Sequence, residues 1–252
     1  MRTALRLEFL KSKRRGLMLT TLLLVGFEVL WIYMAFRNPS ANEIQIGWME
    51  LLYQVPALNS IILPVTAAVI ASRLADVEHK GETWKLLETI QRTECLFHAK
   101  FLCGTWYLLL SIVLLTGCML VCGKVLGYAG EPNLGKFLLF FVFQLFVALE
   151  IFAVQLTLSV LVRNQMIALC IGCGGAFIGL LLLFVPLKPL QYLLPWGHAS
   201  LLYLVYMVNW QPDTRILELA YLRVNWLAFA LTVGAVLLWN FVGGRLLARK
   251  EV

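Results

Sequence analysis

The sequence predicts an all-α protein that crosses a membrane about six times, and three observations carry this prediction. Of the 252 residues, 61% are hydrophobic and 14% are charged, whereas a soluble domain has roughly 45–50% apolar and 25% charged residues. The mean hydropathy is +0.82. Apolar runs of roughly 20 residues, the length of a spanning helix, occur from one end of the chain to the other. Because they leave no stretch for a separate soluble domain, we expect one membrane-spanning domain over residues 1–252.

Six apolar runs match the length of a membrane span. They cover residues 17–36, 51–72, 101–122, 137–162, 166–187 and 224–242. A further apolar stretch, residues 190–208, is nearly long enough to be a seventh span, but Pro195, Gly197 and His198 interrupt it. We therefore expect residues 188–223 to form an extracellular or re-entrant segment.

The distribution of Lys and Arg predicts the orientation of these spans. Of the 21 basic residues, 15 lie in segments on the side that holds both termini and residues 73–100, and 6 lie on the other side. Because short cytoplasmic segments carry the basic excess, both termini and the 73–100 loop should be cytoplasmic. Residues 1–16 would form a basic interfacial segment at anionic headgroups. Orientation thus explains the net charge of +7 better than nucleic-acid binding does.

Motifs for catalysis, cofactors or metals are weak in this sequence. Residues 130–136 have the spacing of a phosphate-binding loop, but Phe137 stands where Ser or Thr would reach magnesium, and Pro132 removes a backbone donor. The three histidines are scattered, and the Cys170-x-x-Cys173 pair lies inside an apolar run, where packing is the better interpretation. We therefore predict no catalytic, cofactor-binding or metal site on this chain.

The longest predicted cytoplasmic loop, residues 73–100, combines charge with an apolar strip. Trp84, Leu87 and Gln91 recur at helical spacing, while Lys85 and Glu88 fall on another face. An exposed apolar strip on a charged loop indicates a docking surface for a partner. A helix lying on the bilayer surface is the alternative.

Residues of this loop, together with a pair ahead of the first span, carry a resemblance to a known family. They are Glu78, Gly81, Trp84, Lys85, Leu86, Leu87 and Lys100, with Glu8-x-x-Lys11 near the N-terminus. With the six-span layout, they make the chain similar to permease subunits of type-2 ATP-binding-cassette exporters, particularly those of lantibiotic-immunity transporters. The resemblance implies a coupling helix between spans two and three, with Glu78, Gly81 and residues 84–87 at the ATPase. Relatives often carry a proline after the Leu-Leu pair, where this chain has residues 88–91 instead, so the end of that helix stays open.

The resemblance implies that the chain is a permease subunit rather than an enzyme. ATP and Mg²⁺ would bind to cytoplasmic ATPase partners, and a second identical or similar permease would complete the transporter. The implied cargo is a lantibiotic or related antimicrobial peptide, expelled from the bacterial cytoplasmic membrane for self-protection or resistance. A type-2 exporter of a drug, lipid or glycan is one alternative, and an ATP-independent intramembrane enzyme or sensor is another.

Polar residues inside the predicted spans are candidates for a translocation path. The candidates are Glu28, Asn59, Gln144, Glu150 and Gln155. Glu28 and Glu150 lie near the middle of their runs, where an ionised side chain is costly unless it is paired or hydrated. Hydrogen bonding between helices is the alternative role. Gly175 and Gly179 permit close helix packing, either within the chain or against a second permease.

Overall fold

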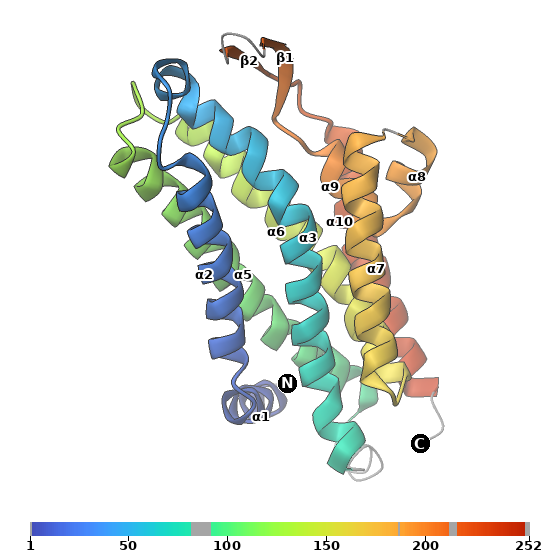
Figure 1. Cartoon of the computed structure of the whole chain (residues 1–252). Coiled ribbons are helices and arrows are strands. Elements are labelled where there is room, and N and C mark those ends of the chain that lie inside the picture. Colours follow the sequence, from blue (N-terminus) through green and yellow to red (C-terminus); the bar gives the residue numbers. More distant parts are fainter. Residues whose placement is uncertain (1, 82–91, 186, 212–215, 250–252) are drawn as a thin grey trace.

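The computed structural model describes residues 2–81, 92–185, 187–211 and 216–249 as a helical bundle with a small β-hairpin (Figure 1). In chain order the described elements are α1 (Arg2–Arg14), α2 (Leu17–Phe36), α3 (Ala41–Gly81), α5 (Thr93–Val125), α6 (Leu134–Leu161), α7 (Gln165–Phe184), α8 (Lys188–Leu193), the 3-10 helix η1 (Pro195–Gly197), α9 (His198–Leu201), β1 (Val205–Gln211), β2 (Ile216–Tyr221) and α10 (Trp226–Arg249).

Six of the described helices are long and apolar enough to cross a membrane: α2, α3, α5, α6, α7 and α10. The prediction of an all-α polytopic membrane protein is thereby confirmed. The predicted spans 51–72 and 101–122 are shorter than the helices that contain them, Ala41–Gly81 and Thr93–Val125. Hydropathy detects only the part of a helix that lies in hydrocarbon, whereas helices α3 and α5 continue beyond it as packed amphipathic ends.

Residues 188–211 and 216–223 add no long helix to the described fold. Residues 188–211 form the short elements α8, η1 and α9 and the strand β1, and β1 pairs in antiparallel fashion with β2 in residues 216–223. The β-hairpin is absent from the predicted fold. Strand β1 reads Val-Tyr-Met-Val-Asn-Trp-Gln, so its apolar and aromatic residues look in sequence like the end of a membrane run.

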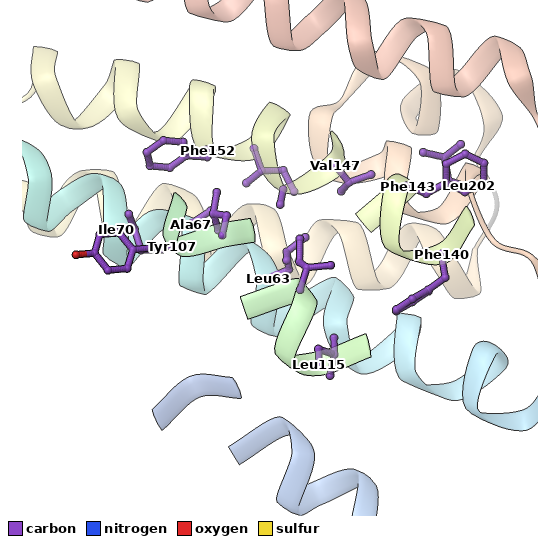
Figure 2. Close-up of a cluster of buried hydrophobic side chains, with 14 of the residues drawn as sticks. Leu63, Ala67, Ile70, Tyr107, Leu115, Phe140, Phe143, Val147, Phe152 and Leu202 are labelled. Carbon is purple, nitrogen blue, oxygen red and sulfur yellow. The ribbon is translucent and has the colours of Figure 1, made fainter. Parts of the chain in front are cut away.

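Helices α3 and α6 form the centre of the bundle. Their most apolar windows are 72% and 61% buried, against 28–33% for the other four long helices. Figure 2 shows the core between them, with Leu63 and Ala67 from α3 facing Val147 and Phe152 from α6. The Phe152 ring also occupies the space beside Gly104 of α5, where a Cβ atom would collide with it. The glycine therefore allows α5 to approach α6 closely.

The outer faces of the four peripheral helices are apolar. On α2, for example, Leu19, Leu23 and Phe27 are 60–64% exposed, and Leu227 and Leu237 of α10 are similarly exposed. Faces of this extent on a soluble monomer would be an aggregation liability. They are suited to contact with lipid hydrocarbon, which makes the chain a multi-pass membrane protein.

Both termini lie at the same end of the bundle, and the β-hairpin lies at the opposite end (Figure 1). Helix α1 crosses the terminal end and is seen nearly end-on, whereas α2 runs along the bundle. Gly16 makes the corner between them with a φ of 63°, in the left-handed region that glycine adopts without steric cost. Which end faces the cytoplasm stays a prediction from the charge distribution.

Cysteine labelling of intact cells tests this orientation. In a cysteine-free background, we expect Thr3→Cys and Arg249→Cys to react with an impermeant thiol reagent only after permeabilisation, because the basic terminal end should be cytoplasmic. Asn209→Cys, on the exposed part of β1, should react in intact cells. Labelling of Arg249→Cys in intact cells would contradict the predicted orientation.

Candidate functional site

Four charged side chains form a closed ring of ion pairs at the terminal end of the bundle. Lys100 of α5 lies 2.9 Å from Glu8 of α1 and 2.8 Å from Glu78 of α3. Lys11 of α1 lies 3.2 Å from the other oxygen of Glu8 and 2.7 Å from the other oxygen of Glu78. Each carboxylate therefore bridges both ammonium groups. We call Glu8, Lys11, Glu78 and Lys100 the ion ring.

The ion ring is almost completely buried, which is unusual for four charged groups. Lys100 and Glu78 are inaccessible and Glu8 is 1% exposed, while Lys11 at 29% is the member nearest to solvent. Burial of an unpaired charge costs several kcal/mol, but here two positive and two negative charges cancel. Lys100 also donates to the Leu74 carbonyl at 2.8 Å, so its ammonium has three polar partners.

The carboxylates of Glu8 and Glu78 also raise the pKa of Lys11, the member of the ion ring nearest to solvent. Burial lowers the pKa of Lys11, but the negative charges and hydrogen bonds of Glu8 and Glu78 outweigh this, so the pKa is raised above its ordinary value. Lys11 therefore keeps its charge throughout the physiological pH range.

Further polar contacts attach α1 to the rest of the bundle. Ser12 and Tyr107 share a hydrogen bond of 2.9 Å between hydroxyl groups. Asp76 of α3 pairs with Arg15 at 3.4 Å, and Arg73 donates to the carbonyl of Arg15 at 2.5 Å. The buried face of α1 carries Ala4, Glu8 and Ser12, four residues apart along one side of the helix. Helix α1 is thus an integral part of the bundle.

The ion ring holds both ends of the segment between α3 and α5. Glu78 lies in the last turn of α3, which ends at Gly81, and Lys100 lies in the second turn of α5, which begins at Thr93. Since α1 supplies the other two members, three helices that meet at this segment are joined by one set of ion pairs.

A comparison with known protein families matches the part of the chain that contains the ion ring. A family model described as ABC-2 family transporter protein matches residues 4–179, well over half of the chain and all four members of the ion ring. The chain belongs to the ABC-2 transporter family. A comparison with curated proteins finds no match.

Membership of the family makes this chain a membrane-spanning permease of a type-2 ATP-binding-cassette transporter, which confirms the resemblance at that level. Such permeases are transport subunits that work with an ATP-binding-cassette ATPase. Of the residues assigned to ATPase coupling, Trp84, Lys85, Leu86 and Leu87 lie outside the described residues, and Gly81 ends α3. Glu78 does not face outward as a docking residue would, because its carboxylate is enclosed by the two lysines.

The five candidates for a translocation path fall into three separate places in the ABC-2 permease. Glu28 lines a cavity of about 10 Å³, close to the size of one water molecule, together with Asn59 and Ser111. Asn59 donates to Gln144 at 3.0 Å, which links α3 to α6. All of these side chains are buried, and Glu28 Oε1 has no hydrogen-bond partner among the described residues.

Glu150 lies in a second place, where it pairs with His198, a residue to which the sequence analysis gave no role. Its Oε2 lies 2.8 Å from Nδ1 of His198, and Nε2 of His198 lies 3.1 Å from the Tyr192 carbonyl. A carbonyl only accepts, so Nε2 carries a hydrogen and a second proton sits between Nδ1 and the carboxylate. The pair is neutral as a whole whichever of the two groups holds that proton. It ties the segment of α8, η1 and α9 to α6.

Gln155 and the two glycines lie where α7 packs against its neighbours. The side-chain amide of Gln155, oriented to satisfy both neighbours, donates to the Ala168 carbonyl at 3.1 Å and accepts from the Gly172 amide at 3.2 Å. Gly175 and Gly179 are covered by Trp196 of η1, with which a Cβ atom at either position would collide. At these glycines the close packing is therefore within the chain.

A groove of about 720 Å³, lined mainly by apolar side chains, lies in the hairpin half of the bundle. Helices α2, α3 and α7 form its walls, and the residues of β1 close its end. Tyr53, Gln54, Ser200, Tyr203 and Tyr206 supply hydrogen-bonding groups among aliphatic side chains. Neither Glu28 nor Glu150 lines this groove.

The described residues offer no cluster of three or more His, Cys, Asp or Glu side chains suited to a metal ion. Residues 130–136, which have the spacing of a phosphate-binding loop, lead into α6, where Asn133 caps the helix by accepting from the Lys136 amide at 3.2 Å.

Substitution of Lys100 tests the ion ring. Lys100→Met leaves two buried carboxylates facing Lys11 alone, and breaking a buried pair in this way costs about 3–5 kcal/mol. We expect a clear fall in the thermal unfolding midpoint of the purified permease. The double variant Lys100→Met/Glu78→Gln should be more stable than Lys100→Met, because its remaining charges cancel.

Lys80→Gln is the matched control, since Lys80 pairs with Asp76 but its side chain is 70% exposed. Exposed pairs contribute about 0–1 kcal/mol. Equal falls in the unfolding midpoint for Lys80→Gln and Lys100→Met would contradict the energetic role of the ion ring.

Proposed function

We propose that this ABC-2 permease exports its cargo by docking a cytoplasmic ATPase onto the segment between α3 and α5. The observation that carries this proposal is the ion ring, which joins both ends of that segment to α1. A segment that is fixed at both ends passes a displacement on to the helices that hold it. Nucleotide-driven movement of the ATPase would thus reach the membrane helices.

Within this proposal, the residues assigned to coupling have two different roles. Trp84, Lys85, Leu86 and Leu87 would contact the ATPase, as the family resemblance implies. Glu78 would act through position, because it holds the end of α3 against Lys11 and Lys100. ATP and Mg²⁺ would be bound by the ATPase subunits, two copies of which would serve a pair of permeases.

For the cargo, we propose a lantibiotic or related cationic, amphipathic peptide, removed from the bacterial cytoplasmic membrane to protect the cell. The support is the 720 Å³ groove, whose mixture of aliphatic and tyrosine side chains suits an amphipathic molecule that arrives from lipid. Such a groove would hold one segment of a peptide at a time. Other amphipathic cargo, such as a drug or a lipid, would fit the same lining.

Trp84→Ala tests the docking of the ATPase. A large aromatic anchor at an interface contributes about 2 kcal/mol or more, so its truncation should weaken ATPase binding roughly 30-fold. Copurification of the ATPase with the detergent-extracted permease measures this loss. Lys85→Ala should weaken binding far less, because an exposed charge at the rim of an interface contributes little. If the Trp84→Ala permease retained its ATPase at the parental affinity, Trp84 would not be the anchor.

Filling the groove tests the cargo. Ile61→Trp places a large ring in the groove, so it should lower the lantibiotic resistance of cells toward that of cells lacking the permease. Leu23→Trp, on the lipid-facing side of α2, should leave resistance unchanged. Susceptibility profiling in which cells lacking the permease lose resistance to a drug and keep resistance to lantibiotics would overturn the peptide cargo.

A further inference from the structure

A second cavity, distinct from the groove, lies at the terminal end of the bundle. It is a cleft of about 680 Å³ between the last turns of α3 and the turn that joins α6 to α7. In Figure 1 the lower ends of α3 and α7 lie side by side there. Its volume is within the range of pockets that bind small molecules.

Among its described lining residues, the cleft has more cationic side chains than carboxylates. Arg73, Lys80 and Arg163 line it, and Asp76 is the carboxylate among the described lining residues. Asp76 is already engaged by Lys80 at 2.8 Å and by Arg15 at 3.4 Å. A guanidinium has five N–H donors, and Arg73 directs one of its nitrogens to the Arg15 carbonyl. The lining is therefore suited to an anion.

The start of α7 also favours an anion in the cleft. Asn164, Gln165 and Met166 line the cleft, and they form the cap and the first turn of this 20-residue helix. The first turn of a helix carries partial positive charge, which adds to that of the nearby cations.

The polarity of the cleft changes with depth. Lys80 and Arg163 lie at the end of the bundle, whereas Val69 lies eleven residues before Lys80, about 16 Å deeper along α3. Leu169 and Met166 face the same cleft from α7, and Met166 is 65% exposed. The cleft is thus charged at the end of the bundle and apolar farther along α3. This arrangement matches a phospholipid, whose phosphate would lie at the cations and whose acyl chain would lie between α3 and α7. A surface for a soluble protein would not need the apolar depth.

We propose that this cleft binds the phosphate headgroup of an anionic phospholipid from the leaflet at the terminal end. Basic pockets between membrane helices are suited to such headgroups. The lipid would bridge the end of α3 to the start of α7, on the side of α3 away from the ion ring. The site does not depend on the ATPase or on the cargo, so it stands or falls separately from the proposed function.

Native mass spectrometry of the detergent-purified permease tests the site. With equal amounts of phosphatidylglycerol and phosphatidylcholine of the same acyl chains, the parent should retain phosphatidylglycerol about tenfold better, which corresponds to roughly 1.4 kcal/mol. Arg73→Gln/Arg163→Gln should lose this preference. Lys80→Gln should lose part of it and leaves both arginines in place.

Arg245→Gln/Arg249→Gln is the matched control, because it removes two exposed charges from the same end of the bundle, on α10. The control should keep the preference for phosphatidylglycerol. Equal losses in both double variants would show general attraction to negative charge and overturn the site. Displacement of the lipid by inorganic phosphate at the same concentration would assign the cleft to a free anion, and displacement by the copurifying ATPase would assign it to that protein.

Discussion

The burial of four charges in the ion ring is the constraint on which the terminal end of this permease depends. Glu8, Lys11, Glu78 and Lys100 come from three helices, and the interior tolerates them only as a neutral set. Loss of any one member leaves an uncompensated charge, so α1, α3 and α5 must assemble together. The hydrogen bond between Ser12 and Tyr107 is a further contact that joins α1 to α5.

Some polar side chains inside the membrane-spanning helices are also paired, and each of these pairs has no net charge. The amide pair of Asn59 and Gln144 joins α3 to α6, and the pair of Glu150 and His198 joins α6 to the short helices that follow α7. Each pair is a hydrogen bond between side chains of different helices. The cargo surface that we propose is instead the groove between α2, α3 and α7.

Hydropathy was sufficient to predict the six long helices, because a membrane span depends on the local composition of about 20 residues. The contacts between helices were beyond such reasoning. Lys100 and Glu8 are 92 residues apart, and Glu150 and His198 are 48 apart, so no spacing rule joins them. The family resemblance selected the four residues of the ion ring individually, but assigned Glu78 to a docking face. In the structure the packing of α1 encloses Glu78, a tertiary effect that its own segment does not encode.

The most direct test of this account is the distance between spin labels at Lys13 of α1 and Glu94 of α5, two exposed positions on helices that the ion ring joins. In a cysteine-free background, pulsed electron paramagnetic resonance should give one narrow distance distribution for the parent and for Lys80→Gln. Lys100→Met, measured in the fraction that still elutes as folded protein, should broaden it, because α1 loses its attachment to α5. A distribution that stays equally narrow in folded Lys100→Met would show that the ion ring does not hold these helices together.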